Sequence, residues 1–308
     1  MSKRDGGFKG LVKGAVRGVR QALREKELER TTLHVDAATL AADLRALGLE
    51  RGDVVFMHSS LKSLGYVEGG PPTLIRALLE AIGPEGTLVV PTYYLPGGTI
   101  HRTCQMTDYV FDPRVHGSNL GAVPDAFLKW PGVERSLHPT HSVSAVGPQA
   151  KYVTEAHHLA PSVFGSGSPW DRVTELDGKV LGLGITMGPV TYYHLLEDRV
   201  GERFPLPVRM AEQYTLTVRD FAGGEHAVPV VPLDPQYMPR RIDHPARDDL
   251  REYFWREFAG RSLLRQGPVG AGNSWWIRSK DFYAHLQRLM DEGITIYATP
   301  EQLASRPN

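Results

Sequence analysis

The sequence contains a single cysteine, Cys104, among 308 residues. One thiol cannot form an internal disulfide bond, and it excludes zinc sites built from several cysteines. The chain has no excess of either charge, since 35 Lys and Arg balance 35 Asp and Glu, so its overall charge gives no case for a nucleic-acid partner. No stretch approaches the roughly 20 apolar residues of a membrane span, and no uninterrupted apolar segment of the signal-peptide kind follows the N-terminus. These absences predict a soluble cytoplasmic protein.

Residues 1–30 differ in pattern from the rest of the chain. Apolar residues recur there at helical spacing, and lysines and arginines fill most of the positions between them, which predicts a basic amphipathic helix. Such a helix could contact an anionic membrane surface, dock on a partner subunit of a homo-oligomer, or pack on its own domain. Residues 31–308 are long enough for one large domain with a sizeable core, and we expect a single domain there.

The segment from residue 53 to residue 91 reads as strand, loop, helix and strand. Residues 53–57 form an apolar run, residues 71–82 carry apolar positions at helical spacing, and residues 86–91 form a second apolar run. This order predicts an α/β fold whose sheet is at least partly parallel. Towards the end of the chain, we expect a turn at 265–271 and a short final strand at 294–297.

The loop between the first strand and its helix is rich in serine and glycine. It offers several hydroxyl groups and glycine N–H groups that open onto a helix N-terminus, an arrangement that suits a phosphate or pyrophosphate. No Gly-Lys-Ser or Gly-Lys-Thr triplet completes a Walker A loop, and Ser59 does not lie in a nucleophile elbow. Ordinary turn and cap chemistry is the alternative interpretation of these serines.

A second strand, loop and helix unit lies at residues 176–199. The apolar run 179–183 ends in a glycine-containing loop, and a helix is expected from near residue 190. His194 and Glu197 are three residues apart, so they share one face of that helix. Ligands of open α/β folds bind at the carboxyl ends of strands, which makes His194 a candidate site residue, although a structural histidine is the alternative. The glycine spacing meets a dinucleotide-binding fingerprint only loosely.

Several segments resemble those of the aminoglycoside 3-N-acetyltransferase family. They are HSSLKSLGYVEGGPPTLIRALLEAIGPEGTLVVPT (58–92), FDPRVHGSNLGAVPDAFLKWPGVERSLHPTHSVSAVGP (111–148), GSGSPWDRVTELDGKVLGLG (165–184) and GPVG (267–270). The resemblance extends over about residues 35–300. It implies one α/β domain layered helix–sheet–helix, unlike the more common GNAT acetyltransferase fold. It also implies acetyl-CoA as the donor and a primary amine, usually on an aminosugar, as the acceptor.

The resemblance further implies which residues bind each ligand. Coenzyme A would be held by the loop after the first strand and by one serine further on, namely His58, Ser59, Ser60, Ser63, Gly65, Gly70 and Ser168. The acceptor would lie against the long loop region after residue 91, with acidic groups meeting its ammonium groups. The substrate-binding residues expected there are Tyr93, Asp112, Asp125, His138 and His141. Asp125 stands where the family usually has Glu.

The expected chemistry is direct acetyl transfer with His194 as the general base. Histidine has an ordinary pKa near neutrality, about 6.5, and suits removal of a proton from an ammonium group. The resemblance favours Asp234 as the acid that orients the His194 ring, while Glu197 and Asp243 are alternative partners.

Two other functions remain open at this point. The H-x-x-H pair of His138 and His141 could belong to a metal-dependent hydrolase, but no third ligand stands at a recognisable spacing, and we expect no metal. A coenzyme A-binding protein without catalysis would not need a histidine base with an acidic partner. Within the acetyltransferase interpretation, the balanced charge favours a biosynthetic aminosugar acceptor over antibiotic inactivation.

Overall fold

A seven-stranded mixed sheet lies at the centre of the structure, in the order β11-β12-β8-β2-β4-β7-β6. The computed structural model describes residues 33–305, and the basic helix predicted for residues 1–30 lies outside them. The middle strands β8 (Lys179–Leu183), β2 (Val54–Ser59) and β4 (Thr87–Pro91) run parallel. Each flanking strand runs antiparallel to its inner neighbour. On one side β7 (Val143–Val146) pairs with β4 and β6 (Glu134–Arg135) with β7, and on the other side β12 (Gly272–Arg278) pairs with β8 and β11 (Arg265–Val269) with β12.

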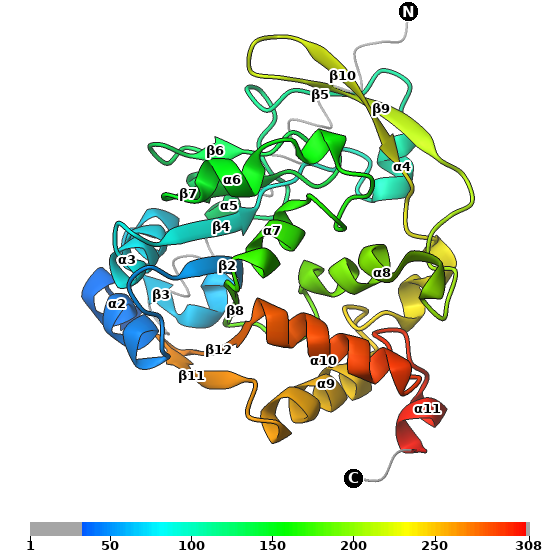
Figure 1. Cartoon of the computed structure of the whole chain (residues 1–308). Coiled ribbons are helices and arrows are strands. Elements are labelled where there is room, and N and C mark those ends of the chain that lie inside the picture. Colours follow the sequence, from blue (N-terminus) through cyan, green and yellow to red (C-terminus); the bar gives the residue numbers. More distant parts are fainter. Residues whose placement is uncertain (1–32, 306–308) are drawn as a thin grey trace, which may run out of the picture.

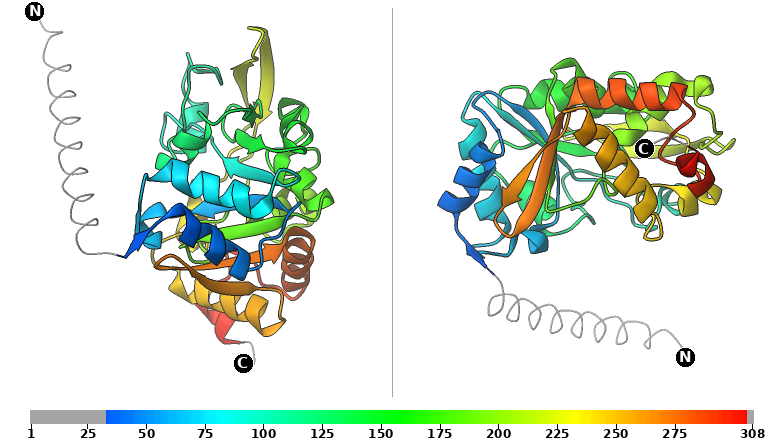
Figure 2. Two further views of the ribbon diagram at one scale, coloured as in Figure 1. Left: turned by 90° about the vertical axis from the view of Figure 1, so that its left-hand side faces the viewer. Right: turned by 90° about the horizontal axis from the view of Figure 1, so that it is seen from below.

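Two hydrophobic cores cover the two faces of this sheet. Because successive side chains of a strand point to opposite faces, Val55 and Met57 of β2 lie in one core and Phe56 lies in the other. The first core contains α2 (Ala37–Ala46), α3 (Pro71–Ile82) and α5 (Ala122–Phe127). The second contains α6 (Ala150–Thr154), α7 (Pro169–Glu175), α8 (His194–Val200), α9 (Asp248–Gly260) and α10 (Ser279–Asp291). Figures 1 and 2 show α2 and α3 on one side and α9 and α10 on the other, which confirms the predicted helix–sheet–helix layering.

A smaller three-stranded sheet, in the order β10-β9-β5, lies beside the main one. The hairpin of β9 (Tyr214–Arg219) and β10 (Glu225–Val230) pairs with β5 (Val110–Phe111) and forms a third apolar cluster with α4 (Ile100–Cys104). Figure 1 shows this hairpin extending beyond the main body of the chain. The long region after β4 that was expected to be a loop therefore contains α4 and β5.

The remaining elements are short. They are β1 (His34–Val35), β3 (Tyr66–Val67), α11 (Pro300–Ala304) and the 3-10 helices η1 (Leu61–Leu64), η2 (His157–Leu159), η3 (Thr191–Tyr193), η4 (Gly201–Arg203) and η5 (Pro235–Arg240). Among residues 33–305, no helix is both long and apolar enough to span a bilayer.

Two predictions for the C-terminal part are wrong. The turn expected at 265–271 is mostly strand β11, which forms a hairpin with β12 through Gly270 and Ala271. Residues 294–297 form no strand, although they are buried in the second core. Both errors arise because an apolar or glycine-containing run does not show whether a neighbouring strand is available to pair with it.

The close packing of β8 against β12 gives a test of the fold. A Cβ on Gly182 would lie 2.3 Å from the indole of Trp275, which is fully buried. We expect Gly182→Ala to lower the free energy of unfolding by roughly 1–3 kcal/mol, because overpacking forces the ring or the strand to move. Urea unfolding measures the change. The control is Gly260→Ala at the end of α9, where nothing lies within 4 Å of the added carbon. Equal stability of the two variants would contradict the packing described.

Candidate functional site

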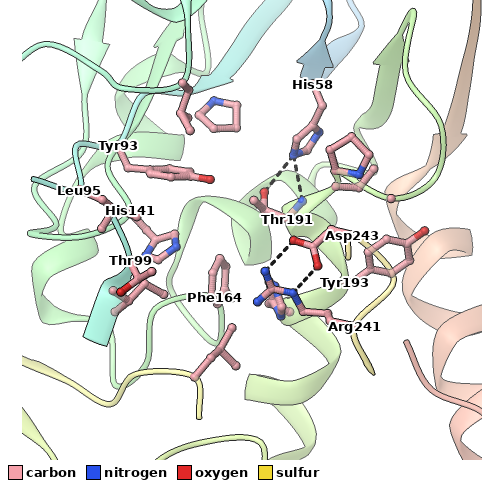
Figure 3. A pocket seen from close by; sticks show the side chains of 18 of the residues that line it. His58, Tyr93, Leu95, Thr99, His141, Phe164, Thr191, Tyr193, Arg241 and Asp243 are labelled. Carbon is pink, nitrogen blue, oxygen red and sulfur yellow. Dashed lines mark hydrogen bonds and ion pairs between the residues drawn. The ribbon is translucent and has the colours of Figure 1, made fainter. Parts of the chain in front are cut away.

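A cavity of about 750 Å³ opens at the carboxyl ends of the parallel strands (Figure 3). Its wall is built from the ends of β2 and β4, the loop that follows β8, helix α4 and the segment 233–243. Six of the residues singled out from the sequence line it, namely His58, Ser59, Tyr93, His141, His194 and Asp243. The topology thus brings together groups that are far apart in the sequence, at the edge where open α/β folds bind ligands.

His194 is the first residue of α8, and its ring is held from behind by Glu197. Nδ1 of His194 donates to Oε2 of Glu197 over 2.9 Å, and both side chains are buried. The hydroxyl of Tyr297, far along the chain, donates to Oε1 of the same carboxylate over 2.9 Å. Because Nδ1 is bonded to Glu197, Nε2 is the ring nitrogen that remains for a substrate. The His194 side chain lines the cavity.

The carboxylate of Glu197 stays ionised although it is buried. Burial raises its pKa, but His194, Arg209 and the Tyr297 hydroxyl act in the opposite direction, and the net pKa is lowered. The Arg209 guanidinium lies 4.0 Å from Glu197 and is also paired with Asp198. A buried ionised carboxylate beside a histidine is the arrangement that stabilises an imidazolium ion.

The predicted pairing of Asp234 with His194 is corrected by these contacts. Asp234 caps η5, where its Oδ1 accepts the backbone N–H of Gln236 (2.9 Å) and its Oδ2 accepts the side-chain amide of the same residue (2.6 Å). It does not line the cavity. The fallback acid, Asp243, does line the cavity, but both of its oxygens are bound by Arg241. Glu197, the other alternative, is the acid bonded to the His194 ring.

His58 links β2 to the turn that precedes His194. Its Nε2 accepts the backbone N–H of Thr191 over 3.1 Å and lies 2.9 Å from the Thr191 hydroxyl, as Figure 3 shows. Burial lowers the pKa of His58 to about 3, so the ring is neutral and its proton is on Nδ1. The ring fixes η3, and through it the start of α8.

The two histidines of the H-x-x-H motif have different surroundings. His141 lines the cavity, where its ring packs 4.8 Å from that of Tyr93 and 4.9 Å from that of Phe164. His138 is not in the lining. Its Nδ1 accepts the backbone N–H of His141 (3.1 Å), and its ring stacks on His157 at 4.5 Å, so the substrate contact predicted for His138 is replaced by a bracing role in the loop.

Two histidines alone do not make a metal site. Burial lowers the pKa of both His138 and His141 well below the ordinary value, which leaves both rings in the neutral form that could bind a metal. Within residues 33–305, no group of three or more His, Cys, Asp or Glu side chains could hold a metal ion. The hydrolase alternative therefore lacks a third ligand in the part of the chain that the structure describes.

The acidic residues predicted to meet the acceptor lie outside the cavity lining. Asp112 is paired with Arg114, whose hydrogen bonds lower the pKa of the carboxyl group, and lies 3.6 Å from Arg219. Asp125 accepts the backbone N–H of Ser118 over 3.0 Å. Both carboxylates stabilise the loop region after β4, so neither is placed to pair with an ammonium group in the cavity.

A second cavity, of about 810 Å³, lies beside the first. It is lined by Ser63 of η1, by the start of the loop that follows β8, by the β11–β12 turn and by α9, with Arg251, Trp255 and Arg256 among its residues. The loop that follows β8 borders both cavities, since Gly184–Met187 line the second and Gly188–Thr191 line the first. Two adjoining cavities at one sheet edge can hold two ligands side by side.

Some of the residues predicted to bind coenzyme A line a cavity, and others do not. Ser59 lines the first cavity and Ser63 the second, while the Ser60 hydroxyl accepts from that of Ser63 over 2.9 Å. Gly65, Gly70 and Ser168 line neither cavity, and each has a structural role in the protein. A Cβ on Gly65 would lie 2.6 Å from the Leu33 carbonyl oxygen, so no larger residue fits there. Gly70 precedes α3 and has a positive φ. Ser168 is fully buried and caps the N-terminus of α7.

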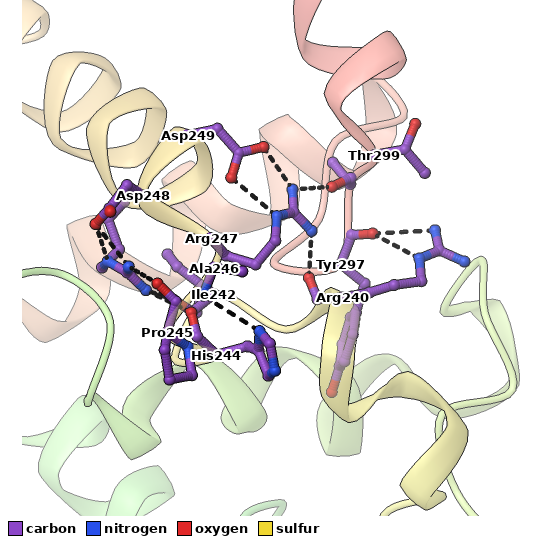
Figure 4. A network of polar contacts seen from close by, with 12 residues as sticks. Arg240, Ile242, His244, Pro245, Ala246, Arg247, Asp248, Asp249, Tyr297 and Thr299 are labelled. Atoms are coloured by element: carbon purple, nitrogen blue, oxygen red, sulfur yellow. Dashed lines mark hydrogen bonds and ion pairs between the residues drawn. The ribbon is translucent and has the colours of Figure 1, made fainter.

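The sequence analysis missed Arg241 as a cavity residue. Arg241 and Asp243 follow η5 and form a pair with two hydrogen bonds of 2.6 Å each. Neighbouring arginines fix this segment, as Figure 4 shows, because Arg240 and Arg247 donate to the carbonyls of Tyr297 and Ala298. The density of arginine in PRRIDHPARDD is the only signal in the sequence, and it does not reveal which guanidinium faces a ligand.

Comparisons with known proteins identify the family to which the fold belongs. The profile of the family described as aminoglycoside 3-N-acetyltransferase matches residues 56–291. The aminoglycoside N(3)-acetyltransferase III of Salmonella sp is 35% identical over 207 residues, which cover 61% of this chain and 72% of that enzyme.

Two solved structures have the same fold. That of the aminoglycoside acetyltransferase AAC(3)-Xa superposes with a TM-score of 0.73 at 28% identity and covers 89% of this chain and 99% of that one. That of AAC-IIIb, which contains CoASH, superposes with a TM-score of 0.69 at 25% identity and covers 87% of this chain and 100% of that one. The fold, the cavity that carries the His194–Glu197 pair and the family match lead to one conclusion: this chain belongs to the aminoglycoside 3-N-acetyltransferase family.

Proposed function

We propose that this chain transfers the acetyl group of acetyl-CoA directly to the primary amine of an aminosugar-type acceptor, with His194 as the general base. The observation that carries the proposal is the His194 ring, which lines the cavity while a buried, ionised carboxylate holds its Nδ1. A protein that only bound coenzyme A would have no use for this pair.

The chemistry follows from the protonation states. A sugar ammonium must lose a proton before its nitrogen can attack, and Nε2 of His194 accepts that proton while Glu197 stabilises the imidazolium. The amine nitrogen attacks the thioester carbon, and the tetrahedral intermediate collapses with cleavage of the C–S bond. The nitrogen loses two protons in all: the imidazolium passes the first to the departing sulfur, and the second is released to solvent as the amide forms. The products are the N-acetyl amine, free coenzyme A and one proton.

We place the acceptor in the first cavity and the body of acetyl-CoA in the second. The loop that follows β8 borders both cavities, so a thioester that passes this loop enters the cavity that His194 lines. Within residues 33–305, the Ser59 hydroxyl makes no hydrogen bond in the protein and is available to a ligand. Arg256 is exposed on α9 at the second cavity and suits a phosphate group of the cofactor.

Replacement of the base tests the proposal. We expect His194→Ala to lower kcat by about 10²–10⁴, the range that loss of a general base costs, while binding of coenzyme A is kept. Release of free thiol from acetyl-CoA, with a panel of aminosugars and aminoglycosides as acceptors, measures turnover. The control is His226→Ala on β10, outside both cavities. Near-normal turnover by His194→Ala would refute the assignment of the base.

The donor site has a separate test. We expect Arg256→Gln to weaken binding of coenzyme A by roughly three- to tenfold, since an exposed ion pair with a phosphate contributes about 1 kcal/mol. The loss should shrink as salt is added, because salt screens exposed charges. Isothermal titration calorimetry at two salt concentrations measures both effects. An unchanged affinity, equal to that of the control Arg203→Gln on η4, would place the cofactor elsewhere.

A further inference from the structure

The acceptor cavity has almost no negative charge to offer a ligand. Of the described residues that line it, Asp243 is the one carboxylate, whereas Arg102 and Arg241 are cationic. Both oxygens of Asp243 already accept hydrogen bonds of 2.6 Å from Arg241. The buried histidines His58 and His141 are neutral at pH 7, because burial lowers the pKa of each.

The carboxylates behind the wall are also committed to partners within the protein. Glu197 accepts from His194 and Tyr297. Asp198 is paired with Arg209 and accepts the backbone N–H of Phe164 over 2.8 Å. To pair with a ligand, either acid would have to leave a buried partner unsatisfied, which is costly.

An acceptor with many ammonium groups therefore fits this cavity poorly. One ammonium can lose its proton to His194, but each further one would enter a partly apolar cavity without a counter-ion. Burial of an unpaired charge is among the most expensive events in binding. The wall is apolar over much of its area, with Leu95, Ile100, Leu233 and Met238 among its residues, so it provides few other acceptors for N–H groups.

Donors for an anion, in contrast, are available. Within residues 33–305, Nη1 of Arg241 makes no hydrogen bond, because Asp243 takes only Nε and Nη2. In Figure 3 the guanidinium of Arg241 lies on the Phe164 side of the pair, while Asp243 lies towards Tyr193. Arg102 on α4 lines the same cavity, and its guanidinium forms no ion pair with any described residue.

We propose that the natural acceptor carries an acidic group, a carboxylate or a phosphate, in addition to its primary amine. Arg241 and Arg102 bind the acid while His194 meets the amine, so one small acceptor is held by both of its polar groups in the same cavity. A guanidinium suits this role because its planar donors match carboxylate and phosphate oxygens. The inference rests on the proposed acetyl transfer and names its substrate class.

A matched series of acceptors tests the proposal. Glucosamine, its 6-phosphate and 2-amino-2-deoxyglucuronic acid share one ring and one amine and differ in the group at a single carbon, and kanamycin represents a polycation. We expect one of the two acidic sugars to exceed glucosamine in kcat/KM by about tenfold to a hundredfold, the range that a charged hydrogen bond supplies. The acidic sugar with the higher kcat/KM shows whether the acidic group of the natural acceptor is a phosphate or a carboxylate.

Substitution of the arginines separates this proposal from the transferase assignment. In Arg241→Gln, the ratio of kcat/KM for the acidic sugar to kcat/KM for glucosamine should fall towards one. In Arg102→Gln, at the exposed rim, this ratio should fall less. The control Arg51→Gln, whose partner Glu85 lies away from both cavities, should keep the preference. Kanamycin turned over as well as the best acidic sugar, or a preference that survives Arg241→Gln, would overturn the proposal. Absence of thiol release with every acceptor would instead refute the transferase function itself.

Discussion

A buried carboxylate, that of Glu197, is the constraint on which the rest of the site depends. An ionised carboxylate can be buried only if several donors satisfy it, and here the donors come from distant parts of the chain. His194 is on the same helix, Arg209 follows that helix, and Tyr297 comes from the segment after α10. The hydrogen bonds of this proposed catalytic pair are thus completed by the C-terminal part of the chain, which supplies the Tyr297 hydroxyl.

The Glu197 carboxylate also makes the stability of the folded protein depend on pH. Its pKa is lowered in the folded protein, so it contributes stability above its ordinary pKa, and this contribution is lost as the pH falls through the lowered value. The other buried histidines of the cavity have different partners from those of His194. Burial lowers the pKa of His58 and His141, and each has neutral partners, Thr191 and Thr140. In the described cavity lining, His194 alone is bonded to a carboxylate.

The sequence predicted those parts of the fold that local periodicity specifies. The helix at 71–82 and the strand at 179–183 have the predicted bounds, because each is a strongly apolar segment ended by glycine or a turn. The spacing of His194 and Glu197 placed both on one helix face. The layered arrangement came from the resemblance to a family, and the two cores on opposite faces of the sheet confirm it.

The errors concern residues whose role is decided by tertiary contacts. The resemblance favours Asp234 over Glu197 as the partner of His194, but Asp234 caps a 3-10 helix and Glu197 is bonded to the ring. His138 and His141 belong to one motif, yet backbone N–H groups occupy His138 and only His141 reaches the cavity. Arg241 could not be distinguished from its neighbours Arg240 and Arg247, because only the folded chain shows which of them faces the cavity.

A comparison of two acidic variants tests the central claim most directly. In Glu197→Gln the amide cannot stabilise an imidazolium ion, so kcat should fall by roughly 10²-fold, with partial recovery in Glu197→Asp and a changed pH–rate profile. Asp234→Asn should keep kcat within about twofold of the wild type, since its carboxylate bonds only to Gln236. The opposite result, a large loss in Asp234→Asn and near-normal turnover in Glu197→Gln, would contradict the account.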